Sequence, residues 1–328
     1  MKRIFIVSLL VIVIIALAVF VEYKAGRKKI TGERNFAFTK DSVWIAPDTN
    51  EIPSTPEGNL IRYGKDLIVN TNHYFGANGI LSTSGNGMNC QNCHLDAGTK
   101  FYGINFATVA NSYPRYKERS GLIESIEKKV QDCFERSMNG KIIDSNGREM
   151  KAFVAYINWV GSNVARDEKP AGTGVEELPF LDRPADTSNG KIVFVNKCQV
   201  CHGKNGEGQL RPDSNGSFYP PLWGPNSYNV GASIYRISKF AGFVKNNMPL
   251  GATHYSPQLT NEEAWDVAAF VNTKYHPYKD LSRDWPVIIK KPYDYPFGPY
   301  PENQFSESDH KYGPFAGIKN YYAGRNYK

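Results

Sequence analysis

Two stretches of the chain carry apolar residues at the spacing of an amphipathic helix. Residues 151–159 and 265–272 resemble each other, and both place apolar residues at positions i, i+3 and i+4. A second resemblance lies upstream of each helix, because residues 64–70 and 190–196 both begin with Gly-Lys and end with Val-Asn. The repeated pattern predicts a mainly α-helical chain of two related domains in tandem.

The N-terminus has a different pattern. Residues 4–21 form a run of eighteen uncharged, mostly aliphatic residues. As a helix this run would reach about 27 Å, just enough to cross the hydrocarbon core of a bilayer. Residues 16–18, Ala-Leu-Ala, also resemble a site that signal peptidase cuts. We expect residues 1–22 to be a retained transmembrane anchor, with a signal peptide cleaved near Ala18 as the alternative.

Prolines and polar residues separate the helical units, and the end of the chain is rich in Tyr, Pro, Phe and Gly. This tail has too few aliphatic residues for a core of its own, so its aromatic side chains are expected to pack over both domains, with disorder as the alternative. The expected organisation is a linker over residues 23–55, a first domain over 56–165, a linker over 166–186, a second domain over 187–276 and a tail over 277–328.

Two pentapeptides carry the chemistry: CQNCH at residues 90–94 and CQVCH at 198–202. Two thiols at this spacing can bond to both vinyl groups of one porphyrin, and the histidine that follows reaches the iron. A zinc site would need four ligands in one cluster, but these pairs lie 108 residues apart. We therefore predict two tandem cytochrome c domains with two covalently bound c-type haems. The predicted attachment residues are Cys90, Cys93 and His94 for the first haem and Cys198, Cys201 and His202 for the second.

The distribution of basic residues and the predicted c-type haems both indicate where the protein is located and what it could bind. Basic residues after the apolar run outnumber those before it, which alone would place the body of the protein in the cytoplasm. Covalent attachment of c-type haem takes place on the outer face of the cytoplasmic membrane, so we expect the periplasmic side instead. The formal net charge of +7 permits an anionic substrate or an acidic redox partner, and no nucleic-acid-binding module is recognisable.

The sixth iron ligand is expected to differ between the two haems. Electron-carrying c-type haems usually have His and Met on the iron. Met248 lies 46 residues after His202 in a loop marked by Pro and Gly, so we expect it to ligate the second haem. The first domain has no comparable methionine after His94.

Cys133 is the one cysteine outside the two motifs. It shares helical spacing with Leu122, Ile126 and Val130, so all four are expected on the buried face of one helix. Such a cysteine is more often a packing residue than a ligand. A free thiol is unusual outside the cytoplasm, however, and the first haem lacks another obvious sixth ligand, so we expect Cys133 to ligate it. A thiolate on iron lowers the reduction potential and stays nucleophilic if the bond opens.

The segment around this cysteine, DCFERSMNG at residues 132–140, is similar to that of the dihaem thiosulfate dehydrogenases (tetrathionate reductases) of bacterial periplasms. The resemblance runs from about Leu60 to the tail and includes NMPLG at 247–251 and HKYGPF at 310–315. It implies His/Cys ligation of the first haem and His/Met ligation of the second. It also implies a reaction that joins two thiosulfate ions into tetrathionate and releases two electrons, or the reverse.

Carried over by position, the resemblance implies that Cys133 is the catalytic cysteine and Ser137 the haem-facing serine. Arg119 matches the arginine ahead of the cysteine helix, and Arg115 lies close by. Where the family often has a second arginine four residues before the cysteine, this chain has Lys129. Lysine keeps the positive charge but loses the bidentate grip that arginine has on two sulfonate oxygens.

The electrons are expected to pass from the first haem to the second and then to a periplasmic or membrane carrier such as a cytochrome c. Two alternatives remain at this point. One is a membrane-anchored dihaem electron-transfer protein without catalysis of its own, and the other is an enzyme that conjugates thiosulfate to a carrier protein. The physiological direction does not follow from the sequence.

Overall fold

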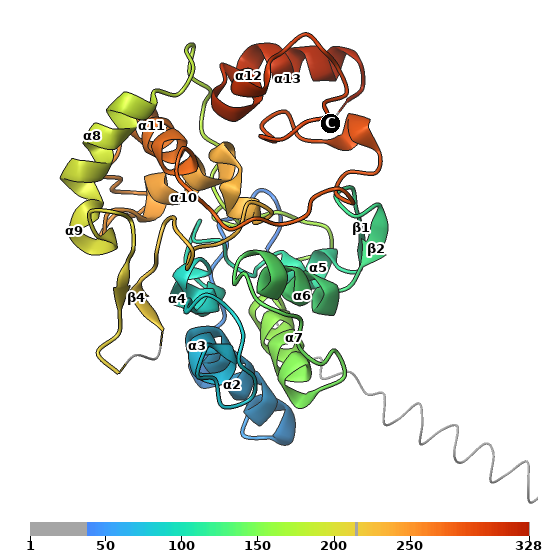
Figure 1. The fold of residues 1–328 in the computed structure, drawn as a ribbon. Helices are drawn as coiled ribbons and strands as arrows, with labels where there is room; N and C mark the ends of the chain where they lie inside the picture. Colours follow the sequence, from blue (N-terminus) through green and yellow to red (C-terminus); the bar gives the residue numbers. More distant parts are fainter. Residues whose placement is uncertain (1–37, 214–215, 328) are drawn as a thin grey trace, which may run out of the picture. The chain divides into compact units, whose positions relative to one another are not determined.

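The computed structural model describes residues 38–213 and 216–327, and the chain from Phe38 onward forms one compact unit (Figure 1). The predicted anchor or signal segment, residues 1–22, lies outside the described residues. Within the described part of the chain, no helix is both long enough and apolar enough to cross a membrane.

The described elements are mostly helices, with two short antiparallel hairpins. The first half contains η1 (Thr49–Glu51), α2 (Pro56–Val69), α3 (Thr71–Phe75), η2 (Cys90–Asn92), α4 (Leu95–Gly98), α5 (Val109–Ser112), β1 (Arg115–Lys117), β2 (Leu122–Glu124), α6 (Ile126–Arg136) and α7 (Arg148–Val160). The second half contains α8 (Thr187–Lys197), α9 (Gln199–His202), β3 (Gln209–Leu210), β4 (Ser217–Tyr219), η3 (Ser233–Tyr235), α10 (Ile237–Asn247) and α11 (Asn261–Asn272), and the tail contains η4 (Ile288–Lys290), α12 (Glu307–Tyr312) and α13 (Phe315–Gly324).

The sequence repeat corresponds to the same helix pairing in each half. In the first half α2 packs on α7, and in the second half α8 packs on α11 (Figure 1). A Cβ atom on Gly64 would lie 2.0 Å from the carbonyl oxygen of Ala152, and one on Gly190 would lie 1.9 Å from that of Asp266. Glycine is therefore required at both positions, because it lets the two helices of each pair approach backbone to backbone.

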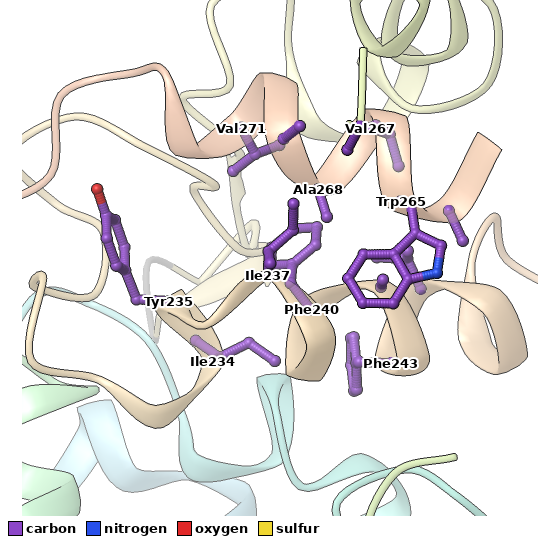
Figure 2. Close-up of a cluster of buried hydrophobic side chains, with 14 of the residues drawn as sticks. Ile234, Tyr235, Ile237, Phe240, Phe243, Trp265, Val267, Ala268 and Val271 are labelled. Carbon is purple, nitrogen blue, oxygen red and sulfur yellow. The ribbon is translucent and has the colours of Figure 1, made fainter. Parts of the chain in front are cut away.

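Each helix pair has its own hydrophobic core. In the first half Leu67 of α2 and Phe153 of α7 are fully buried. In the second half Trp265 and Val271 of α11 pack with Phe240 of α10, as Figure 2 shows. Each core supports the CxxCH motif of its own half, and Met88 and Met138 of the first half also belong to the second core.

The segment before the cysteine helix differs from the sequence prediction. Residues 122–124 form strand β2, which pairs with β1, and helix α6 begins only at Ile126. Leu122 is 62% exposed, so the prediction that it shares a buried helical face with Cys133 is wrong. The reason is local, since Gly121 has a φ of +70°, which favours a turn, and Ser125 caps the helix by accepting a hydrogen bond from the amide of Lys128.

The tail contacts both halves of the described unit. The amide of Trp285 donates to the carbonyl oxygen of Arg119 in the first half, at 2.7 Å. Phe297 stacks on Tyr235, and Phe315 lies against Trp265, both in the second half. The aromatic residues of the tail therefore extend the second core and hold the β1–β2 hairpin of the first half.

Candidate active site: two cofactor pockets and a buried thiol

The first CxxCH motif is held by the end of α2 and the start of α3. The amide of Cys90 donates to Oγ1 of Thr71 at 3.0 Å, and the side-chain amide of Gln91 donates to the carbonyl oxygen of Val69 at 3.0 Å. Nδ1 of His94 lies 2.5 Å from the carbonyl oxygen of Ile104. A carbonyl can only accept, so Nδ1 carries the proton and Nε2 is left free for a metal.

Burial keeps the groups of this motif uncharged. It lowers the pKa of His94 to about 4, an effect that the charge of Lys129 increases and the hydrogen bond to Ile104 opposes. Burial also raises the pKa of the thiols of Cys90 and Cys93 to about 12. A neutral imidazole is the form that binds iron, and buried sulfurs without charge suit thioether bonds to a porphyrin.

Two residues of α6 and the residue that ends it share a pocket with this motif. Lys129 and Cys133 lie one helical turn apart, and Ser137 follows one turn later, so all three line one face of the helix. The other side of the pocket is formed by Cys90, Cys93 and His94, and most of the remaining lining is apolar. The structure thus brings three of the predicted catalytic residues to the first haem-attachment motif.

In the second CxxCH motif the histidine is held in the same way as in the first. His202 is buried, and its Nδ1 lies 2.8 Å from the carbonyl oxygen of Pro220, which leaves Nε2 for a metal. Burial lowers the pKa of His202. Met248, which follows directly after α10, lines the same pocket as Cys198, Cys201 and His202.

Two residues that line the second pocket, Met88 and Tyr228, were not predicted from the sequence. Met88 is 2% exposed, and both Met88 and Cys93 line the first pocket as well as the second. Tyr228 also lines the second pocket. Its hydroxyl is buried and has no hydrogen-bond partner among the described residues. The two cofactor sites therefore share a wall at Met88 and Cys93, and one hydroxyl of the second pocket has no partner among the described residues.

These features fit covalently attached haem at both motifs. Each site offers two half-buried cysteines and a histidine whose tautomer is fixed by a backbone carbonyl. In residues 38–213 and 216–327, no group of three or more His, Cys, Asp or Glu side chains forms a metal-binding cluster, so the cysteines have no zinc-type ligand set there.

Opposing effects act on the pKa of the Cys133 thiol. Burial raises the pKa of the Cys133 thiol, and Lys129 opposes this most strongly. Asp132 raises it further, while Arg119 and Arg136 lower it. The thiolate of Cys133 therefore depends on nearby positive charge to compensate for its burial.

The two predicted arginines do not line the thiol pocket. Arg119 donates from Nη1 to the carbonyl oxygen of Gly231 and from Nη2 to Oγ of Ser233, both at 3.2 Å, and its guanidinium lies 5.8 Å from the ring of Trp285. Arg115 is exposed on β1. Arg119 thus acts on Cys133 only through its charge.

Sequence reasoning missed Arg136, at the end of α6. Its guanidinium donates two hydrogen bonds to the carboxylate of Asp284 in the tail, at 2.8 and 2.7 Å. Burial lowers the pKa of Arg136, but the contact with Asp284 more than compensates, and the pKa is raised overall. No local pattern could have paired these residues, because they lie 148 positions apart.

Comparison with known proteins agrees with this architecture. The chain matches the family described as SoxA/TsdA, cytochrome c domain, over residues 82–165, and the cytochrome c family over residues 187–274. Two matched cytochrome c domains indicate two c-type haems.

Several relatives share most of their length with this chain. It is 35% identical over 241 residues to a thiosulfate dehydrogenase from Psychrobacter arcticus, covering 73% of this chain and 71% of the relative. It is 39% identical over 198 residues to a thiosulfate dehydrogenase from Allochromatium vinosum, covering 59% and 70%. A solved structure of the thiosulfate dehydrogenase TsdBA from Marichromatium purpuratum is 31% identical with a TM-score of 0.66. That match covers 72% of this chain and 50% of the solved chain, so this chain spans half the length of that structure. This chain belongs to the thiosulfate dehydrogenase family of dihaem cytochromes c.

Proposed function

We propose that this protein oxidises two thiosulfate ions to tetrathionate, with Cys133 as the nucleophile. One observation carries the proposal: the thiol of Cys133 lines the same pocket as Cys90, Cys93 and His94, with Lys129 one turn away. A thiol beside a cofactor site and a cation is suited to bind a sulfur anion and to pass electrons onward. The relatives named thiosulfate dehydrogenase support the same substrate.

The proposed reaction has two balanced steps. In the first, the thiolate of Cys133 forms a bond to the sulfane sulfur of one thiosulfate, which gives an enzyme S-thiosulfonate and releases two electrons. In the second, the sulfane sulfur of another thiosulfate attacks the same atom, so that tetrathionate leaves and the thiolate of Cys133 returns. Lys129 stabilises the dianion near the thiol, and Ser137 offers a hydroxyl donor one turn beyond it.

When bound, haem at the two motifs would supply one-electron redox centres for the two electrons. His94 and His202 would hold the iron through Nε2, and Met248 would be a further ligand in the second pocket. Cys133, which lines the first pocket, would be the second ligand there. Met88 and Cys93 line both pockets, which supports electron transfer between cofactors bound in them.

We also propose that electrons leave at the second pocket to a small carrier such as a cytochrome c. Leu250 and Phe218 line this pocket, yet they are 76% and 60% exposed, and Val200 of the second motif is 76% exposed. An apolar rim of this kind favours a brief contact with a redox partner. The same residues would serve the reverse reaction, the reduction of tetrathionate, in which the Cys133 thiolate attacks the central disulfide.

The location of the protein is part of the proposal. The apolar run of residues 4–21 favours an N-terminal membrane anchor, and c-type haem attachment favours the periplasmic side. Cell fractionation followed by carbonate extraction distinguishes an anchored protein from one that is cleaved near Ala18 and released to the periplasm.

The test compares the purified dihaem protein with Cys133→Ala in thiosulfate-dependent reduction of an acceptor, with tetrathionate measured as product. We expect the variant to lose at least about a hundredfold in rate, because its nucleophile is gone. Both proteins must carry two haems and accept electrons from a chemical reductant. If Cys133→Ala forms tetrathionate at the wild-type rate, the proposed role of the thiol is refuted, and if neither protein reacts in either direction the chain is an electron carrier.

A further inference from the structure

Residues 102–104 of the first half hold groups from both halves of the protein. The carbonyl oxygen of Ile104 lies 2.5 Å from Nδ1 of His94 and fixes the tautomer of that imidazole. Two residues earlier, the carbonyl oxygen of Tyr102 accepts a hydrogen bond at 3.1 Å from Nδ2 of Asn247, the last residue of α10. One short segment therefore links the histidine of the first CxxCH motif to the C-terminal end of α10 in the second half.

This segment is held firmly by its own half. The amides of Tyr102 and Ile104 donate to carbonyl oxygens of residues 172–174, at 2.7 and 2.9 Å. Asn105 is 5% exposed and donates from Nδ2 to the same stretch at 2.7 Å. Both Tyr102 and Ile104 have positive φ, +50° and +54°, a conformation that their side chains disfavour and the surrounding contacts must enforce. The segment is therefore a rigid support for whatever binds to it.

The side chain of Asn247 is buried, and its two ends differ. It is 2% exposed, and Nδ2 donates to the carbonyl oxygen of Phe243 at 2.9 Å as well as to that of Tyr102. Oδ1 is buried and has no hydrogen-bond partner among the described residues. A buried amide oxygen without a hydrogen bond costs free energy that an apolar side chain of the same size would avoid. The donor is therefore the part of Asn247 that this position uses.

Met248 follows Asn247 directly and lines the second pocket. Its amide donates to the carbonyl oxygen of Val244 at 2.9 Å, which ends the hydrogen bonding of α10. Leu250, two residues further on, is 76% exposed, so the chain beyond Met248 has little packing on its outer side. The hydrogen bond from Asn247 to the first half is thus placed at the residue that sets where Met248 begins.

We propose that Asn247 is a positioning residue, which ties Met248 to the segment that orients His94, so that the first half of the protein controls the iron ligand of the second pocket. The inference rests on the proposed function in one respect, the ligation of the second haem by Met248. A ligand that is already held in place loses less conformational entropy when it binds. Because methionine ligation raises the reduction potential of a c-type haem, the same anchor also affects that potential.

The experiment replaces Asn247 with leucine, which has a similar volume and no donor, in the full dihaem protein. Imidazole is titrated into the oxidised protein while the red absorption band of methionine-ligated haem is followed, and both reduction potentials are measured by spectroscopic titration. In Asn247→Leu the band should be lost at an imidazole concentration about fivefold lower or less, because one buried hydrogen bond that holds Met248 is gone. The potential of the second haem should fall toward its value in Met248→Ala, and that of the first should not change.

Asn105→Leu perturbs the same connection from the other end. Asn105 lines neither pocket, but its side chain holds residues 102–104 in place. The potential of the first haem should rise, because a weaker hydrogen bond from His94 makes the imidazole a poorer electron donor to the iron. The potential of the second haem should fall, because Asn247 loses its support. General loosening would instead admit water to both pockets and shift both potentials in the same direction.

Asn272→Leu is the matched control. Asn272 ends α11, its Nδ2 donates to the carbonyl oxygen of Tyr235 at 2.8 Å, and its Oδ1 is buried without a partner among the described residues. This contact lies within the second half. Asn272→Leu should therefore lower the midpoint of thermal unfolding, as Asn247→Leu does, and leave the imidazole titration and both potentials unchanged.

The outcomes separate this inference from the proposed function, since no measurement needs turnover of thiosulfate. If Met248→Ala shifts the second potential and Asn247→Leu does not, the role of Asn247 is overturned while ligation by Met248 stands. An equal shift in Asn272→Leu also overturns it, because any lost hydrogen bond at a helix end would then have the same effect. If Met248→Ala matches the wild type in both measurements, ligation by Met248 fails, and the inference fails with it.

Discussion

Replacing Asp284 with alanine tests how the tail is held on the first half of the protein. The carboxylate of Asp284 accepts two hydrogen bonds from Arg136, and a third contact comes from the hydroxyl of Tyr295 at 3.5 Å. The side chains of Arg136 and Asp284 are only 13% and 8% exposed. The substitution leaves the guanidinium of Arg136 buried without its counter-ion.

The expected cost follows from that burial. Removing one partner of a buried ion pair costs about 3–5 kcal/mol. The carbonyl oxygen of Gly231, 3.3 Å from Nη1 of Arg136, remains as an acceptor, so we expect the lower end, about 3 kcal/mol. At roughly 2–4 °C per kcal/mol, the midpoint of thermal unfolding should fall by roughly 6–12 °C.

The assay is thermal unfolding of the dihaem protein followed by circular dichroism, with a double-mutant cycle. Replacing both partners with apolar residues, Arg136→Met with Asp284→Leu, should recover most of the stability, since no charge is left buried. Glu307→Ala is the matched control in the tail, because it breaks an exposed pair with Lys311 and should cost less than about 1 kcal/mol. If Asp284→Ala costs no more than this control, the pair does not hold the tail.

Two further predictions concern the second pocket and the first helix pair. Met248→Ala should lower the reduction potential of the second haem, because a methionine ligand raises it, and a spectroscopic redox titration that finds no change would exclude Met248 as the ligand. Gly64→Ala should destabilise the first half by about 1–3 kcal/mol through overpacking between α2 and α7, as measured by denaturant unfolding. Gly324→Ala, where the added Cβ meets nothing within 4 Å, is its control and should be nearly neutral.

The sequence was sufficient to predict those features that are encoded within a short stretch of chain. The haem attachment residues follow from a five-residue spacing, and helices α7 and α11 follow from apolar periodicity, because each feature is complete within a few turns of chain. The repeat of Gly64 and Gly190 was visible as a pattern, but its physical cause, contact between two helix backbones, could be seen only in the structure.

Features that join distant segments could not be predicted in this way. The apolar residue Leu122 fits a helical period, yet the turn at Gly121 and the pairing of β1 with β2 place it in a strand. The pairing of Arg136 with Asp284 and the shared wall at Met88 depend on how the tail and the two halves pack. Single-sequence patterns contain no information about such contacts.

The packing of the tail also decides which cations near Cys133 remain available to a substrate. Asp284 neutralises Arg136, and Arg119 is committed to the backbone of Gly231. Both still lower the pKa of the Cys133 thiol, so they favour the thiolate from a distance without competing for the anion. Lys129 lines the thiol pocket and forms no ion pair within the described residues, so it is left to bind a dianion. The arrangement separates activation of the thiol from binding of the substrate, so a substitution of Asp284 should change stability much more than KM.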